Sequence, residues 1–197
     1  ESYLYKDVLQ WENIQKPEKL EKLLTALALQ MGNEVSYNEL SQLVGIDNLT
    51  VEKYIRLLEQ SFIIFRLDGF NRNLRNEIKK GKKIYFYDNG IRNAILNNFN
   101  SLNLRDDVGK LWENFLISER MKTNSYHLKN FKTYFWRTHA QQEIDFLEEA
   151  NGKISAYEFK WNERKKAKIP KNFSETYNPE IEKIITKDNF HEFVINR

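Results

Sequence analysis

The sequence predicts an α+β protein with two domains, residues 1–100 and 101–197, and three observations support this. Apolar side chains recur at helical spacing in the first part of the chain. Two β-branched and aromatic runs then flank a basic segment, which indicates two strands with a loop between them. A new helical pattern begins near residue 107, and strand patterns follow it on both sides of Asn151-Gly152, a dipeptide typical of β-hairpin turns.

The composition is that of a globular protein, with 41% hydrophobic, 14% aromatic and 30% charged residues among 197. The net charge of +3 is mildly basic and gives only weak support for a nucleic-acid partner. The absence of cysteine excludes disulfides and thiolate metal sites and is compatible with the cytoplasm, the location we expect. No apolar run is long enough to span a membrane. Because the chain begins at Glu1, we expect a fragment of a longer protein.

The first helices are predicted from apolar spacing and capping residues. Residues 3–14 predict a short connecting helix, and residues 18–31 predict an amphipathic helix with leucines along one face. Ser36, followed by Glu39 three residues later, has the capping-box pattern, so a further helix is expected to begin there. Gly45 is expected to end that helix.

The next elements complete the order of a winged helix-turn-helix. Thr50 is predicted to cap the second helix of the pair. Strands are expected at 62–67 and 84–87, on either side of the basic segment 71–83, and residues 88–90 predict a turn. Two short helices joined by a tight turn and followed by a strand, a basic loop and a strand predict a winged helix with 71–83 as its wing.

The second domain is expected to contain one long helix and a central sheet. The helix covers residues 107–122, with apolar candidates Leu111, Phe115, Ile117 and Met121. Strand patterns cover residues 133–137, 143–147, 154–161, 181–185 and 191–195. A helix followed by strands and a short αβ tail favours an α/β or α+β domain.

The hairpin around Asn151-Gly152 permits a prediction of register. If these two residues form the turn, side chains alternate between two faces from there outward. The expected facing pairs on one apolar face are Ile144 with Phe159 and Phe146 with Tyr157. The expected pairs on the other face are Glu143 with Lys160, Asp145 with Glu158, and Leu147 with Ala156.

Two carboxylates facing each other across a hairpin suggest a metal site. Asp145 and Glu158 would repel each other unless a cation lay between them, and Mg²⁺ is usually held by one or two carboxylates with water and phosphate. Lys160 could orient or deprotonate a water, or neutralise charge on a phosphate. A third acid would come from the preceding helix, and we favour Glu113 over Glu119. The alternative is a solvated hairpin face with ordinary ion pairs.

Basic residues mark two candidate nucleic-acid contacts. Lys53 and Arg56 lie on the outward side of the second helix of the helix-turn-helix, which could enter a major groove. Two basic clusters could contact phosphates, and their candidate residues are Arg72, Arg75, Lys79, Lys80, Lys82, Lys83, Lys165 and Lys166. The alternatives are that the winged helix docks a protein and that both basic clusters are solvated loops.

The stretches SYNELSQLVGIDNLTVEKYIRLLEQSFII, NEIKKGKKIYFYDNGIRNAIL, GKLWENFLISE and EIDFLEEANGKISAYEFKW resemble the C-terminal region of bacterial and archaeal AAA+-type ATPases. In that group a P-loop ATPase is followed by a winged helix and a PD-(D/E)XK restriction-endonuclease-like domain. The resemblance implies a winged helix followed by an α/β domain with a central mixed sheet. It places nuclease-like positions on Glu113, Asp145, Glu158 and Lys160.

These observations lead to three functional hypotheses. The first is an endodeoxyribonuclease that uses Mg²⁺ or Mn²⁺, bound by Asp145 and Glu158, with Lys160 and Glu113 as catalytic residues. The second is an inactive nuclease-fold and winged-helix module that binds DNA or a protein. The third is a domain through which the ATPase assembles into oligomers. No G-x-x-x-x-G-K-[ST] motif occurs, so no ATP site is expected in this fragment, and its expected partner is the missing ATPase domain.

Overall fold

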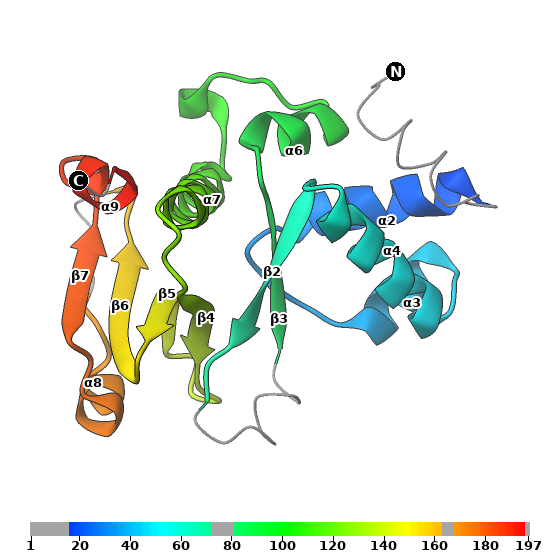
Figure 1. Cartoon of the computed structure of the whole chain (residues 1–197). Helices are drawn as coiled ribbons and strands as arrows, with labels where there is room; N and C mark the ends of the chain where they lie inside the picture. The colour runs from blue at the N-terminus through cyan, green and yellow to red at the C-terminus, as the bar shows by residue number, and fades with distance from the viewer. Residues whose placement is uncertain (1–15, 72–80, 163–167, 196–197) are drawn as a thin grey trace. The chain divides into compact units, whose positions relative to one another are not determined.

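The computed structural model describes residues 16–71, 81–162 and 168–195 (Figure 1). The chain divides into two compact units. The first unit consists of Glu1–Arg66 and Lys82–Phe99, and the second unit consists of Leu67–Gly81 and Asn100–Arg197. The predicted helix over 3–14 and most of the predicted wing lie outside the described residues. In the described part of the chain, no helix is both long enough and apolar enough to cross a membrane.

The first unit contains helices followed by a small sheet, in the order predicted for a winged helix. Its elements are α2 (Pro17–Leu29), β1 (Glu34–Val35), α3 (Tyr37–Val44), α4 (Asn48–Gln60), the first part of β2 (Ile64–Gly69), β3 (Lys82–Phe86) and α6 (Asn89–Ile95). Leu20, Leu23, Leu24 and Leu27 of α2 are buried, as their spacing predicts, whereas Leu29 at its end is exposed. β1 pairs with β3 in antiparallel orientation.

The caps of the helix-turn-helix are confirmed at one end and corrected at the other. Ser36 accepts a hydrogen bond from the backbone of Glu39, and Gly45 adopts the left-handed conformation (φ 73°) that ends α3. The predicted cap Thr50 is wrong, because Asp47 is the N-cap of α4 and accepts the Thr50 backbone N–H at 2.9 Å. Aspartate is among the preferred N-cap residues, so α4 begins before Thr50.

Residues 88–90 do not form the predicted turn. Asp88 is the N-cap of α6, and its carboxylate accepts the N–H groups of Gly90 at 2.6 Å and Ile91 at 3.2 Å. Aspartate is common both in turns and at N-caps because its side chain bonds to nearby backbone N–H groups. The helical segment that follows decides between the two outcomes.

The second unit contains a mixed sheet with helices on both faces. Its elements are the end of β2, a 3-10 turn (Leu102–Leu104), α7 (Val108–Tyr126), β4 (Lys132–Arg137), β5 (Glu143–Ala150), β6 (Lys153–Phe159), α8 (Lys171–Tyr177), β7 (Ile181–Ile185) and α9 (Phe190–Val194). The strand order is β2-β4-β5-β6-β7, with parallel pairs β2·β4 and β6·β7 and antiparallel pairs between. The predicted α+β class is confirmed.

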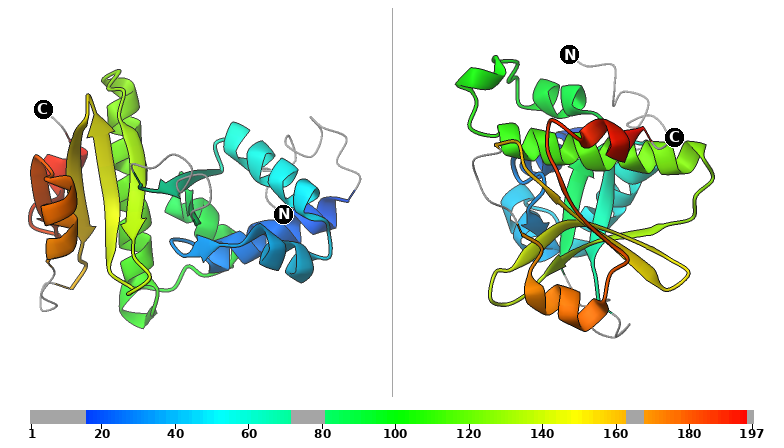
Figure 2. Two further views of the ribbon diagram at one scale, coloured as in Figure 1. Left: turned by 90° about the horizontal axis from the view of Figure 1, so that it is seen from below. Right: turned by 90° about the vertical axis from the view of Figure 1, so that its left-hand side faces the viewer.

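The two faces of this sheet have separate cores. Phe146, Tyr157 and Phe159 contact Phe193 of α9 on one face. On the other face, Leu147, Ile154 and Ala156 form a cluster with Trp136 and Phe173 of α8. Figure 2 shows α7 and α9 on one side of these strands and α8 on the other.

The sequence prediction fails at two places in this unit. Residues 191–195 were expected to be a strand, but α9 is a helix, and the buried Phe193 is its anchor on the sheet. The apolar run is too short for its period to distinguish a strand from a helix. On α7, Leu111 and Ile117 are buried as predicted, whereas Phe115 and Met121 are only partly buried.

Candidate functional site

The β5–β6 hairpin has the predicted turn and the predicted register over its outer half. Asn151 and Gly152 both have positive φ angles, 53° and 76°, as a two-residue type I′ turn requires. The paired residues run from Ala150 with Lys153 to Phe146 with Tyr157. The turn therefore sets this part of the hairpin, as the sequence indicates.

A β-bulge changes the register nearer the candidate site. Tyr134 pairs with Leu147 and Trp136 pairs with Ile144, so Phe135 alone faces two residues of β5. One extra residue in a strand turns the side chains beyond it to the opposite face. Ile144 consequently joins the cluster of Leu147 and Trp136. Its predicted place beside Phe159 on the other face is wrong.

The bulge also replaces the predicted pairing of Asp145 with Glu158. The β5–β6 ladder of the described strands ends at Phe146, and beyond it the Asp145 carboxylate accepts the Phe159 backbone N–H at 2.7 Å. Bulges often redirect a side chain beside a functional site. Asp145 is thereby held at the end of β6 by a side-chain bond in place of ladder pairing.

Glu158 and Lys160 form a close ion pair at this end of β6. The Lys160 Nζ donates to Glu158 Oε1 at 2.6 Å, and the two side chains are 28% and 13% exposed. The second oxygen of Glu158, Oε2, is buried and has no hydrogen-bond partner among the described residues. Glu143 was predicted opposite Lys160, but its carboxylate lies 3.8 Å from Arg137 Nε instead.

Three carboxylates act on the Lys160 ammonium. Burial lowers the pKa of Lys160, but the hydrogen bond that Lys160 donates to Glu158 and the charges of Glu158, Asp145 and Glu113 raise it, and the net pKa is raised. The four residues proposed from sequence therefore lie within one electrostatic cluster. Lys160 is protonated at neutral pH, so it can orient a water or neutralise negative charge but cannot act as a base in this state.

Glu113 and Glu119 have different surroundings on α7. Glu113 is partly buried beside the buried Trp112, and its charge acts on Lys160. Glu119 pairs with Lys122 at 2.6 Å, and its side chain is 38% exposed. The ion pair of Glu119 is an ordinary surface contact along a helix. Of these two α7 carboxylates, Glu113 is thus the one that belongs to the electrostatic cluster around Lys160.

The residues of this cluster fit a metal that is shared with a substrate. No group of three or more metal-ligating side chains was found in the described part of the chain, so they do not form a complete protein cage. Mg²⁺ is usually held by one or two carboxylates together with water and phosphate. The buried Oε2 of Glu158 supplies an oxygen ligand of the kind that Mg²⁺ and Mn²⁺ prefer.

The candidate nucleic-acid residues are dispersed, and part of them lies beyond the described residues. Lys53 and Arg56 line a groove on the outer side of α4, where Arg56 pairs with Glu52 at 3.4 Å. Lys82 lies over the Tyr37 ring, with Nζ 5.2 Å from its centroid, and Lys83 is only 3% exposed. Lys83 is therefore poorly placed to contact phosphate. The described ranges do not include Arg72, Arg75, Lys79, Lys80, Lys165 or Lys166.

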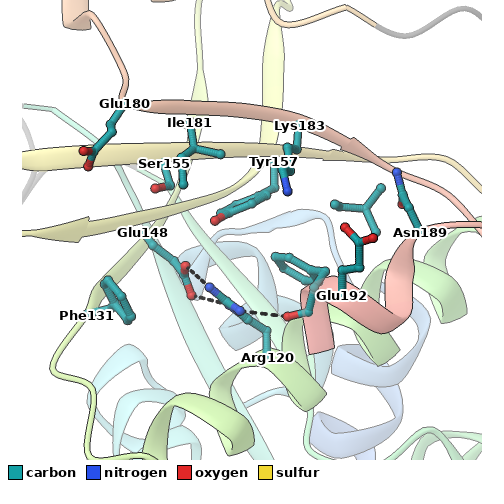
Figure 3. Close-up of a pocket in the computed structure, with 12 residues that line it drawn as sticks. Arg120, Phe131, Glu148, Ser155, Tyr157, Glu180, Ile181, Lys183, Asn189 and Glu192 are labelled. Atoms are coloured by element: carbon teal, nitrogen blue, oxygen red, sulfur yellow. Dashed lines mark hydrogen bonds and ion pairs between the residues drawn. The ribbon is translucent and has the colours of Figure 1, made fainter. Parts of the chain in front are cut away.

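A cavity of about 540 Å³ lies elsewhere in the second unit, between α7, α9, β6 and β7 (Figure 3). Its floor is a buried ion pair in which Arg120 Nε and Nη2 each donate to Glu148 at 2.8 Å. Asn124 donates to the same carboxylate at 2.5 Å, and Arg120 Nη1 donates to the Phe193 carbonyl at 2.8 Å. The guanidinium and the carboxylate satisfy each other, so a structural role is assigned to this floor, although Asn124 Oδ1 is buried without a hydrogen-bond partner among the described residues.

This buried network was not predicted from the sequence. Arg120 and Asn124 lie three and seven residues beyond the buried Ile117, so they continue the inward face of α7. A charged residue on a buried helical stripe is the available signal, because such a residue is almost never fully buried unless it is paired. The partner, Glu148, lies 28 residues away on β5.

Comparisons with known proteins define the family without assigning an activity. The model of the family DUF8612, a domain of unknown function, matches residues 1–102, and the chain belongs to that family. A second domain of unknown function, DUF4143, matches residues 108–196.

The similarity to curated proteins is distant. The chain is 25% identical over 138 residues to the uncharacterized proteins Rv2008c of Mycobacterium tuberculosis and Mb2031c of Mycobacterium bovis. Each match covers 69% of this chain and 30% of the relative, so the chain spans about a third of these proteins. No solved structure matches.

Proposed function

We propose that the second unit is a Mg²⁺-dependent endodeoxyribonuclease of the PD-(D/E)XK type. The proposal rests chiefly on the buried Oε2 of Glu158, which has no hydrogen-bond partner in the described structure although Oε1 accepts from Lys160. A buried carboxylate oxygen without a partner is destabilising, and a divalent cation would reverse that cost. A solvated hairpin face, the alternative interpretation, offers no reason for this oxygen to be buried.

In the proposed site, Asp145 and Glu158 hold Mg²⁺ or Mn²⁺. Mg²⁺, when bound, polarises a phosphate and lowers the pKa of a bound water. The Phe159 N–H fixes the Asp145 carboxylate, and Lys160 fixes the Glu158 carboxylate. The Lys160 ammonium orients the attacking water and neutralises charge that develops on the phosphorus oxygens. Glu113 assists by adding negative charge near the Lys160 ammonium.

We further propose that the chain is the C-terminal module of a cytoplasmic AAA+-type ATPase. The support is the resemblance of its motifs to that group, together with relatives that are about three times as long as the matched region. The ATP site would lie in the parent protein outside this chain. A full-length parent that contains no P-loop motif and hydrolyses no ATP would refute this proposal.

The nuclease proposal is tested by Mg²⁺-dependent nicking of supercoiled plasmid. We expect Asp145→Asn to reduce the nicking rate about 100-fold or more, because it removes a metal-binding charge. An asparagine oxygen can still accept the Phe159 N–H, so the hairpin and the thermal unfolding temperature should change little. Ca²⁺ in place of Mg²⁺ is the metal control. Equal activity of wild type and variant would refute the assignment of Asp145.

A second candidate function, DNA binding without cleavage, is favoured by two observations. The described residues contain no group of three metal ligands, and Lys53 and Arg56 line an outward groove on α4. Glu52 reduces the positive charge of that groove by pairing with Arg56. DNA binding there would therefore be weak and would depend mainly on phosphate contacts.

This second function predicts binding that depends on salt but not on metal. We expect the double variant Lys53→Ala/Arg56→Ala to reduce the slope of log affinity against log salt by about 2, one for each lost phosphate contact. Asp145→Asn should leave the affinity unchanged. The matched control is Lys16→Ala/Lys22→Ala, which removes two exposed cations from the region of α2. If both double variants bind duplex DNA alike, α4 does not contact DNA.

A further inference from the structure

An aromatic cluster lies directly beside the Lys160 site. Trp161 follows Lys160 at the end of β6, and Trp112 precedes Glu113 on α7. The two indole rings meet edge to face, with centroids 5.5 Å apart. Phe190 of α9 contacts Trp112 at 5.2 Å. Each tryptophan is therefore the chain neighbour of one residue of the proposed catalytic site.

Trp161 also carries a cation over its ring. The Nζ of Lys187 lies 5.0 Å from the ring centroid, and Lys187 is exposed while Trp161 is only partly buried. Lys187 belongs to a turn that Asn189 holds in place, because Asn189 accepts the Thr186 N–H at 2.8 Å and donates to the Ile184 carbonyl at 3.0 Å. The fold thus holds the turn from which the Lys187 side chain reaches the ring.

We propose that Trp161 stacks with an unpaired base of a single-stranded nucleic acid, and that Lys187 contacts the adjoining phosphate. This inference rests on the proposed nuclease function and specifies its substrate class. A base in a duplex has both faces covered by its neighbours, so an unpaired base is the one that can offer a face to Trp161. Base–aromatic stacking is stronger than an exposed cation–π contact, so a base can displace Lys187 from the ring.

The neighbouring residues support this substrate. Trp161 contacts Trp112 of α7, and Glu113, the next residue of α7, acts electrostatically on Lys160, so both ends of the Lys160-Trp161 pair lie near the same part of α7. Lys187, when displaced from the ring, remains on its turn within reach of the same strand. The edge contact from Trp112 fixes the Trp161 plane, which reduces the cost of ordering that side chain on binding. Stacking at this position would place the phosphate beside the proposed metal site.

The test separates base stacking from phosphate attraction and from cleavage. Binding of the whole chain to a fluorescent oligothymidylate is compared with binding to an abasic strand of the same length, in EDTA so that no cleavage occurs. We expect the strand with bases to bind at least about fivefold more tightly. Trp161→Ala should abolish this preference for the strand with bases, and Trp161→Phe should retain part of it. Near-ultraviolet circular dichroism confirms that each variant is folded.

The Lys187→Ala variant tests the phosphate contact. It should weaken binding of both strands equally and reduce the salt slope by about 0.7. Lys153→Ala, at the far end of β6, is the matched control and should change neither quantity. Any of three results would overturn the proposal. These are equal affinity for the two strands, a preference for the strand with bases that persists in Trp161→Ala, and tighter binding of a matched duplex. A base-dependent ratio without Mg²⁺-dependent cleavage of either plasmid or single-stranded DNA would leave the stacking site intact and refute only the nuclease function.

Discussion

Replacing Lys160 with alanine should slow Mg²⁺-dependent cleavage by about 10²- to 10³-fold, the range seen when a group that stabilises transition-state charge is removed. The affinity for Mn²⁺ should stay the same or increase, because the Lys160 ammonium competes with the metal for Glu158 Oε1 at 2.6 Å. A loss of rate without a loss of metal affinity distinguishes a catalytic cation from a structural one. Plasmid nicking measures the rate, and calorimetric titration with Mn²⁺ measures the affinity.

The matched control for this variant is Lys153→Ala. Lys153 begins β6, the strand that Lys160 follows, and also pairs with a glutamate, Glu180, at 2.6 Å, but its side chain is 67% exposed. We expect this control to retain the wild-type rate. If both lysine variants cleave at the wild-type rate, Lys160 has no role in catalysis. If Lys160→Ala loses Mn²⁺ binding, Lys160 maintains the structure of the metal site and has no direct role in catalysis.

The turn of the hairpin was predictable from its own two residues, whereas the β-bulge in β5 was not. Asn151 and Gly152 tolerate the positive φ angles of a type I′ turn, so the register near them follows from the sequence. The bulge at Asp145 and Phe146 depends on how β5 pairs with β4, a separate segment of the chain. A register counted outward from the turn therefore fails where a second neighbouring strand imposes its own spacing.

The predictions of one helix boundary and of one short element were wrong for a related reason. Asp47 and Thr50 are both acceptable N-cap residues, and the turn after Gly45 decides which one begins α4. The short apolar run within 191–195 fits either a strand or a helix, and packing of Phe193 on the sheet decides for α9. Local propensity gives the candidates, while tertiary packing chooses among them.

The members of the candidate site could be named from sequence, but their grouping is a result of the fold. The E-x-K spacing places Glu158 and Lys160 together, since Lys160 directly follows the strand that contains Glu158. Glu113 is 45 or more residues away from them in the chain, and α7 must dock on the sheet before its charge can act on Lys160. The aromatic contact between Trp112 and Trp161 likewise requires the folded unit.

The largest effect on stability should come from the buried pair Arg120–Glu148. Glu148→Ala should lower the free energy of unfolding of the second unit by about 3–5 kcal/mol, because it leaves a buried guanidinium without its carboxylate. The side chains of Arg120 and Glu148 are 7% and 1% exposed, so solvent screens the pair little. Asn124 would lose its acceptor as well. The loss should exceed that from a surface pair such as Lys153–Glu180.

Urea unfolding followed by tryptophan fluorescence measures this loss in the relevant unit, since Trp112, Trp136 and Trp161 all lie in it. The double variant Arg120→Met/Glu148→Leu is the decisive comparison. It removes both charges, keeps most of the buried volume and should be more stable than Glu148→Ala, because no unpaired charge remains. If Glu148→Ala costs less than about 1 kcal/mol, the pair behaves as a hydrated surface ion pair. The cavity above it would then be open to water, and its polar floor would be available to a ligand.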